Sequence, residues 1–309
     1  MTTAFFTHDD CEHHVTPMGH PEQVARLKRI RARLDTPEFA GLDRRDCPLG
    51  TDADIGLCHP QAYIDQIIAA EPASGTRRLD EDTHMSPGSM QAARRAVGGA
   101  IAAVDAVLAG EVKNAFVAAR PPGHHAETAL MMGFCLFGNV AIAARHAMER
   151  HGLSRVAVVD FDVHHGNGTQ DLLWNESRAL FFSSHQMPLW PGTGAPEERG
   201  AHGQIHNLPL PPESDGAHMQ RVYEAEVFPK IDAFAPELIL ISAGFDAHAA
   251  DPLANLNWHE KDFVWLTEKL CALAAKHCEG RVVSVLEGGY DLDALSESAA
   301  AHVSALMRA

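Results

Sequence analysis

Short apolar runs recur along the whole chain and constrain its fold more than any other feature. Most are continuous rather than alternating, which is typical of strands buried on both faces of a parallel sheet. We expect eight strands, at residues 3–6, 55–58, 115–118, 155–159, 179–183, 204–208, 238–242 and 282–286.

Segments with helical spacing lie between these runs, at residues 21–34, 87–108, 139–151, 219–234, 258–276 and 292–307. This alternation predicts a wound α/β sheet. Because the chain shows no internal repeat, low-complexity tract or polar linker, we expect residues 1–309 to form a single domain.

Composition narrows the class of partner and the compartment. The formal net charge of −16 argues against binding to nucleic acid or to an anionic membrane, and leaves Lys-rich proteins, peptides or polyamines open. The six cysteines include no CxxC pair, so reduced thiols in a cytoplasmic protein are expected. No apolar run reaches the ~18 residues of a membrane span, and the first residues lack a secretory signal pattern.

Polar residues gather where predicted strands end. Six of the 20 histidines fall in five segments that begin at residues 120, 160, 184, 243 and 287, each directly after a strand. Ligands of parallel sheets bind outside the carboxyl ends of the strands, so these segments predict one shared site. The histidines of residues 13–20 are expected in a loop before the first long helix.

Asp160, Asp162 and His164 alternate in sequence. If the strand continues through them, their side chains project to one side, and Asp246 from another strand end can join them. Three nitrogen and oxygen ligands with one open position are typical of a catalytic zinc site.

His124 and His125 form a second cluster, in a loop braced by proline and glycine. Asp160 and Asn167 lie in the adjacent strand-end segment and could contact one histidine each, which would make the pair unequal. Tyr290 follows two glycines, and its phenol could stabilise an oxyanion.

These residues stand in motifs that resemble the zinc-dependent histone deacetylase family, which includes acetylpolyamine amidohydrolases and acetoin-utilisation proteins. The motifs are RPPGHHA at 120–126, GFCLFGNVA at 133–141, DFDVHHGNGT at 160–169, SAGFDA at 242–247 and EGGY at 287–290. The resemblance runs from about residue 8 to about residue 298. It implies the arginase–deacetylase fold, a single α/β domain with an eight-stranded parallel sheet flanked by helices.

The resemblance also implies roles for the polar residues. Asp162, His164 and Asp246 match the ligands of one zinc ion. His125 matches the general base, His124 its electrostatic partner or a general acid, and Tyr290 the residue that polarises the carbonyl. Asp160 would pair with His124. Asn167 stands where many members carry Asp, and Asn at this place resembles the class II branch. A potassium site beside the zinc is implied at Asp160, Asp162, His164 and Ser183.

Substrate contacts are implied at the channel and its rim, by Gly133, Phe134, Trp190, Leu253, Asp82 and Gly288. The expected reaction removes acetyl or other short acyl groups from acyl-lysine in proteins or peptides, or from small amines. A homo-oligomer is compatible with these motifs.

Three alternatives remain open. An acetylpolyamine deacetylase would favour an acidic residue where this chain has Leu253. An arginase-like binuclear manganese hydrolase would need an Asp-x-Asp where this chain reads Asp246-Ala247-His248. A non-catalytic acyl-lysine binder would not need the two histidines and Tyr290.

Overall fold

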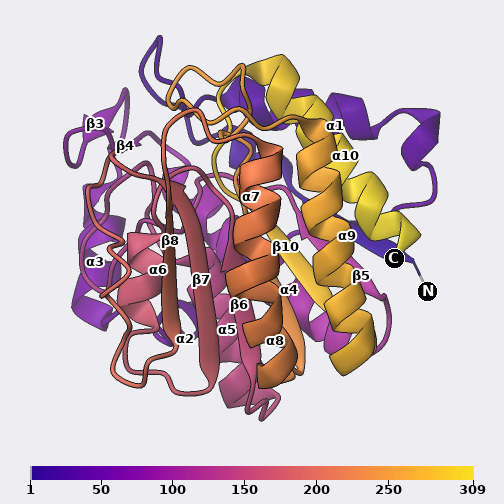
Figure 1. Cartoon of the computed structure of the whole chain (residues 1–309). Helices are drawn as coiled ribbons and strands as arrows, with labels where there is room; N and C mark the ends of the chain where they lie inside the picture. The colour runs from indigo at the N-terminus through magenta and orange to yellow at the C-terminus, as the bar shows by residue number, and fades with distance from the viewer. Residues whose placement is uncertain (1) are drawn as a thin grey trace.

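An eight-stranded parallel sheet forms the centre of the molecule, and the computed structural model describes residues 2–309. The strand order is β2-β1-β5-β10-β9-β6-β7-β8, and every neighbouring pair is parallel (Figure 1). The predicted parallel sheet is therefore confirmed. Its strands are β1 (Thr3–Thr7), β2 (Asp43–Asp46), β5 (Asn114–Val117), β6 (Val156–Asp160), β7 (Ala179–Gln186), β8 (Ile205–Leu210), β9 (Leu238–Ala243) and β10 (Val282–Leu286).

One of the eight predicted strands is wrong. Residues 55–58 form no strand, because Ile55 ends the short helix α2 (Asp52–Ile55) and turns follow it. The eighth strand is β2, whose sequence Asp-Arg-Arg-Asp is charged throughout. As an edge strand it has one neighbour and only half-buried or exposed side chains, so it lacks the apolar run that marks a central strand.

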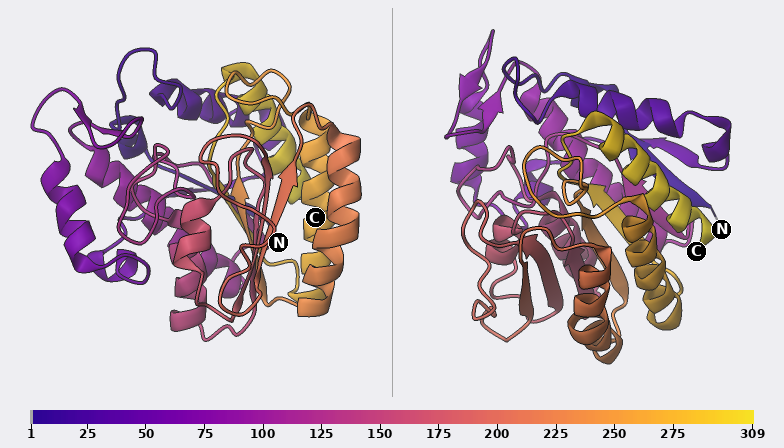
Figure 2. Two further views of the ribbon diagram at one scale, coloured as in Figure 1. Left: turned by 60° about the vertical axis from the view of Figure 1, so that its left-hand side comes forward. Right: turned by 45° about the horizontal axis from the view of Figure 1, so that its top comes forward.

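Helices cover both faces of the sheet, as Figure 2 shows. One layer contains α1 (Val24–Leu34), α7 (Gly216–Val222), α8 (Phe228–Phe234), α9 (Glu260–His277) and α10 (Leu292–Arg308). The other contains α2, α3 (Gln61–Ala70), α4 (Ser89–Leu108), α5 (Asn139–Arg150) and α6 (Asn167–Leu172). All six predicted helices are present within a few residues of their predicted ends. The helix predicted at 219–234 is α7 and α8, joined by a π-helical turn at Tyr223–Val227.

The remaining elements are short. They are the 3-10 helices η1 (Asp9–Glu12) and η2 (Pro37–Phe39), and a small hairpin of β3 (Arg77–Arg78) and β4 (His84–Met85).

The core lies between the sheet and its two helical layers. Strands β6, β9 and β10 are buried along their whole length. Each large apolar side chain buried there contributes about 2 kcal/mol, which holds these strands in the middle of the sheet. Strands β1 and β10 lie in the same sheet and α1 packs on α10, so residues 2–309 form one α/β domain. Within this range no helix has the length and apolar character that a membrane crossing requires.

Candidate metal centre

The loops at the carboxyl ends of β6 and β9 bring together three of the predicted residues. Strand β6 ends at Asp160, so the expectation that it continues through Asp162 and His164 is wrong. The chain bends there instead, because the Asp162 N–H donates to Asp160 (3.0 Å) and the His164 N–H donates to Asp162 (2.9 Å). Such side-chain-to-backbone turns let a short loop direct successive side chains to one point.

Asp162, His164 and Asp246 form a buried group whose ligand atoms all lie within 4.8 Å of one another. His164 Nδ1 lies 3.1 Å from Asp162 Oδ1 and 3.2 Å from Asp246 Oδ2. Both carboxylates are fully buried, and burial together with the charge of Asp162 raises the pKa of Asp246 to about 7. Two carboxylates at this depth repel each other unless a cation lies between them. The donor set therefore fits a divalent metal ion held by one nitrogen and two carboxylates.

Glycines leave room for these carboxylates. A Cβ atom on Gly244 would lie 2.0 Å from Asp162 Oδ2, and one on Gly288 would lie 2.1 Å from Asp246 Oδ2. The Gly288 N–H also donates to Asp162 (2.8 Å), and the Val163 N–H donates to Asp246 (2.9 Å). Gly288 was predicted to contact the substrate, but it lies against these two carboxylates. It does not line the cavity that opens over His125 and His164, which is described below.

The adjacent histidines have different partners. His124 Nδ1 lies 2.9 Å from Asp160 Oδ2, and His125 Nδ1 lies 2.7 Å from Asn167 Oδ1. The Asn167 amide nitrogen donates to Glu127 (2.8 Å), which leaves the Asn167 oxygen to accept from His125. Neutral His125 therefore carries its proton on Nδ1 and has a free lone pair on Nε2.

The surroundings also make the two histidines unequal in charge. Burial lowers the pKa of His125 well below its usual value, and the neighbouring His124 and His164 lower it further. Burial lowers the pKa of His124 too, but Asp162 and Asp160 outweigh that effect and raise it well above its usual value. The surroundings thus favour the neutral form of His125 and the protonated form of His124, whose ring centroids are 3.9 Å apart.

Glu287 is a buried acid in the EGGY motif, and the sequence predicted no role for it. Its carboxylate accepts from the backbone N–H groups of Gly123 (2.7 Å) and His124 (3.1 Å) and from the Ser242 hydroxyl (3.1 Å). These contacts tie the loop of the two histidines to the ends of β9 and β10. The only signal in the sequence was its place directly after a strand.

A cavity of about 380 Å³ opens over His125 and His164. Its lining includes the predicted residues Asp82, Gly133, Phe134, Trp190, Leu253 and Tyr290, together with His20, which was expected in a loop that could reach the pocket rim. Pro21, Glu81, His84 and Leu189 also line it, and the sequence predicted no role for them. The Trp190 ring lies 4.7 Å from the His125 ring, and the Phe134 ring lies 5.8 Å from the Tyr290 ring. Gly133 has φ +56°, and a Cβ atom there would lie 2.4 Å from His125 Cδ2 and 2.6 Å from Trp190 Cη2.

Arg26 supports the turn that carries Tyr290, a role that was not predicted from the sequence. It donates to the backbone oxygens of Gly289 (2.6 Å) and Glu287 (2.5 Å), and its guanidinium lies 5.0 Å from the centroid of the Tyr290 ring. The Tyr290 N–H donates to Asp251 (2.7 Å). The turn that carries Tyr290 is therefore fixed on two sides.

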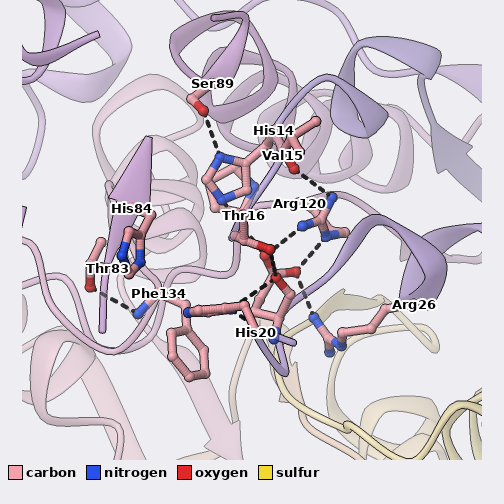
Figure 3. Close-up of polar contacts among 12 residues, drawn as sticks. His14, Val15, Thr16, His20, Arg26, Thr83, His84, Ser89, Arg120 and Phe134 are labelled. Atoms are coloured by element: carbon pink, nitrogen blue, oxygen red, sulfur yellow. Dashed lines mark hydrogen bonds and ion pairs between the residues drawn. The ribbon is translucent and has the colours of Figure 1, made fainter. Parts of the chain in front are cut away.

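A buried ionic network in turn holds Arg26. Glu22 accepts from Arg26 (3.1 Å) and binds Arg120 through both carboxylate oxygens, while His14 lies 3.6 Å away. His14 Nδ1 lies 2.8 Å from the Ser89 hydroxyl oxygen. Figure 3 draws this contact as a dashed line and shows Arg26, Arg120 and His14 in the same network. All of these side chains are buried.

The residues predicted to bind potassium lie around the start of the same loop. Asp160 and Ser183 are register partners on β6 and β7. Ser183 accepts from the Gly166 N–H (3.3 Å) and lies 3.1 Å from His185 Nδ1.

Comparison with known proteins identifies relatives along the whole chain. The profile of the histone deacetylase domain matches residues 20–306. A histone deacetylase-like amidohydrolase from Pseudomonas aeruginosa is 41% identical over 281 residues, which cover 88% of this chain and 73% of that protein. A probable deacetylase from Archaeoglobus fulgidus is 37% identical over 95% of this chain and 82% of its own length.

Two further relatives bear on substrate and fold. The polyamine deacetylase HDAC10 from Homo sapiens is 36% identical over 99% of this chain, which covers 48% of that protein. The crystal structure of the HDA15 HD domain superposes with a TM-score of 0.94 at 32% identity, and covers 99% of this chain and 88% of the other. The fold expected from the motifs is confirmed.

Proposed function

We propose that this chain, which belongs to the histone deacetylase family, is a zinc-dependent amidohydrolase that removes acetyl or other short acyl groups from acyl-lysine side chains. The observation that carries this proposal is the buried group of Asp162, His164 and Asp246, placed beside two unequal histidines at one cavity. Family membership supports amide hydrolysis, and the cavity supports an acyl substrate.

Zinc is the metal we propose for Asp162, His164 and Asp246. A mixed nitrogen and oxygen ligand set suits zinc, and three protein ligands leave one position open for chemistry. When bound, the ion would supply Lewis acidity, which polarises an amide carbonyl and lowers the pKa of water. We also propose potassium at Asp160, Asp162, His164 and Ser183.

His125 is the proposed general base. Its Nε2 lone pair is free because Asn167 accepts from Nδ1, and neutral His125 can take a proton from the attacking water. Asp160 stabilises the protonated form of His124, which would stabilise negative charge or donate a proton to the leaving amine. The products would be a short carboxylic acid and a free amine.

Tyr290 is the proposed oxyanion donor. Burial raises the pKa of its phenol well above the usual value, so the hydroxyl keeps its proton and can donate. A preorganised donor of this kind contributes about 3 kcal/mol to transition-state stabilisation. Arg26 and Asp251 would act as positioning residues, because they fix the backbone around Tyr290.

The cavity favours an uncharged acyl chain near the metal group. Phe134, Trp190 and Leu253 supply apolar walls, whereas Glu81 and Asp82 add carboxylates to the lining. The apolar walls can pack against the methylenes and the acyl group of acyl-lysine. The two carboxylates can accept hydrogen bonds from substrate amides or bind a cationic part of the substrate. An acetylated polyamine is the second candidate substrate. It is supported by the carboxylates of Glu81 and Asp82, which would attract a cation, and by the similarity to the human polyamine deacetylase.

The binuclear alternative receives no support from His248. Its Nε2 lies 3.4 Å from Glu260, and its Nδ1 accepts from the Ala250 N–H (3.0 Å). His248 therefore does not extend the ligand group formed by Asp162, His164 and Asp246. For this reason we propose one catalytic metal ion.

The test combines a substrate panel with one variant. Acetyl-, propionyl-, lactyl- and trifluoroacetyl-lysine peptides and acetylated polyamines are compared, each with and without a chelator. Tyr290→Phe should keep its bound metal and lose about 100-fold in kcat. Tyr223→Phe, which removes a buried phenol bonded to Ser184, is the matched control and should keep wild-type turnover.

Three results would contradict the proposal. Wild-type turnover in Tyr290→Phe would remove the oxyanion role. If acetylated polyamines were hydrolysed far faster than every acyl-lysine peptide, the polyamines and not acyl-lysine would be the substrate. Chelator-insensitive hydrolysis would exclude a catalytic metal.

A further inference from the structure

A cluster of two histidines and one aspartate lies away from the cavity, where α4 and α5 end. Asp105 is in the last turn of α4, His146 is in the last turns of α5, and His151 follows the end of α5. The Nε2 atoms of both histidines lie 2.6 Å from the same oxygen, Asp105 Oδ1. The two ring centroids are 5.4 Å apart.

We propose that Asp105, His146 and His151 bind a divalent transition-metal ion such as zinc, at a site separate from the catalytic group. Two imidazole nitrogens and one carboxylate oxygen already converge on one point, and water can complete the coordination. Ligand atoms of a tetrahedral zinc site are about 3.3 Å apart, so the cluster needs to open by less than ~1 Å. The side chains of Asp105 and His151 are 49% and 32% exposed and can make this adjustment.

The ring nitrogens that face Asp105 are the ones that can bind an ion. His146 can offer only Nε2, because its Nδ1 is enclosed and has no hydrogen-bond partner among residues 2–309. A neutral imidazole binds a metal ion through an unprotonated Nε2 and keeps its proton on Nδ1. The ion would therefore take the place of the hydrogen bonds that now join both Nε2 atoms to Asp105 Oδ1, with no proton lost from either ring.

Both helices add negative potential at this point. The carboxyl end of a helix carries a partial negative charge from its unpaired carbonyls, equivalent to about half an elementary charge. Here α4 and α5 end beside each other, and Asp105 adds a full negative charge in a last turn, where a carboxylate is unfavourable. A cation would relieve both effects and join the two helices.

The cluster is remote from the catalytic group. Helix α5 begins at Asn139, and His146 and His151 lie about 10 Å and 18 Å further along its axis, at the opposite end. Helix α4 leads into the amino end of β5, whereas the cavity lies at the carboxyl ends of the strands. The two sites can therefore be loaded and removed independently.

A second histidine cluster on the surface provides a control. His248, His259 and Glu260 are also close enough to hold an ion. However, His248 Nδ1 accepts from the Ala250 N–H, so the proton of neutral His248 is on Nε2, the atom that faces Glu260. The His259 backbone N–H donates to the Asp262 side chain (2.9 Å), which fixes His259 at the start of α9. Because His248 already uses the lone pair of Nδ1 and carries its proton on Nε2, it has no free lone pair for an ion, and we expect no metal there.

The experiment measures metal per chain in the full-length protein. Metal-depleted wild type, His151→Asn, Asp105→Asn and His259→Asn are dialysed against graded, buffered free zinc and analysed for bound zinc. His151→Asn and Asp105→Asn should each bind one equivalent fewer than wild type, and His259→Asn should match wild type. Zinc should also slow amide hydrogen exchange in the last turns of α4 and α5 of wild type, but not of His151→Asn.

Circular dichroism is used to test whether each variant is folded. If His151→Asn is not folded, the conclusion rests on Asp105→Asn. The catalytic group is intact in all four proteins, so the difference in zinc content does not depend on the proposed function. Equal zinc content in wild type, His151→Asn and Asp105→Asn would overturn the proposal. Loss of the equivalent in His259→Asn alone would also overturn it, because it would place the ion at the other cluster.

Discussion

Glu22→Gln is the substitution that tests the buried ionic network most directly. Glu22 has no exposed surface, and it binds Arg120 through both oxygens and Arg26 through one. The amide of glutamine has nearly the same shape but no charge. Arg26 and Arg120 would then remain buried without their counter-charge, which is the costly way to break an ion pair.

The expected loss follows from the ionisation of Glu22. Burial raises its pKa, but Arg120 and then Arg26 outweigh burial and lower the pKa from 4.5 to about 2. A difference of about 2.5 units corresponds to roughly 3 kcal/mol of stability. Because the folded pKa is below the unfolded one, this stability is present above about pH 4.5 and is lost as the pH falls toward 2. Removing one partner of a buried pair costs about 3–5 kcal/mol, which agrees.

Urea unfolding at neutral pH measures this loss. Glu22→Gln should lower the free energy of unfolding by about 3 kcal/mol. Glu12→Gln is the matched control, because Glu12 pairs with Arg31 near the surface and should cost less than about 1 kcal/mol. Turnover of Glu22→Gln should also fall, since Arg26 would hold the turn of Tyr290 less firmly. A loss below about 1 kcal/mol for Glu22→Gln would refute the reasoning.

Three further predictions concern acid stability, substrate choice and metal. Burial lowers the pKa of His302 to about 3, so its neutral form stabilises the fold above about pH 6.5 and this contribution is lost as the pH falls toward 3. Between pH 7 and 5, wild type should therefore lose about 2 kcal/mol more than His302→Gln in urea unfolding. Leu253→Glu should raise the ratio of kcat/KM for acetylated polyamines over acetyl-lysine peptides at least ~10-fold, because a cavity carboxylate attracts cations. Chelation should abolish turnover and zinc should restore it, whereas activity regained only with manganese would contradict a zinc enzyme.

The central strands and the convergence of the site were predictable because both depend on local sequence. A strand buried on both faces must be apolar throughout, as β6 and β9 are, and polar residues directly after such strands meet at one edge. Strand β2 could not be recognised in this way, since an exposed edge tolerates its four charged residues. The bend after Asp160 was also missed, because alternation in sequence does not distinguish a strand from a loop held by aspartate side chains.

Residues that act through long-range burial left the weakest signals. Glu22 and Arg26 are four residues apart near the start of α1, a spacing that is typical of an ion pair on a helix surface. Their burial arises from Arg120 and from the backbone at Gly289, far away in the chain. Charge spacing within a helix cannot reveal such partners, so the support of Tyr290 required the structure.

The position of β10 in the sheet determines when the sheet can be completed during synthesis of the protein. β10 is the last of the eight strands of this sheet in chain order, yet it joins β2-β1-β5 to β9-β6-β7-β8. Until residue 286 has emerged, the nascent chain can build only two half-sheets with unpaired edges, which are open to wrong pairing. The EGGY segment follows at once, so Tyr290 is added as the sheet closes. A chain that stalls or stops before β10 should therefore be both misfolded and inactive, and no partial product should hydrolyse amides.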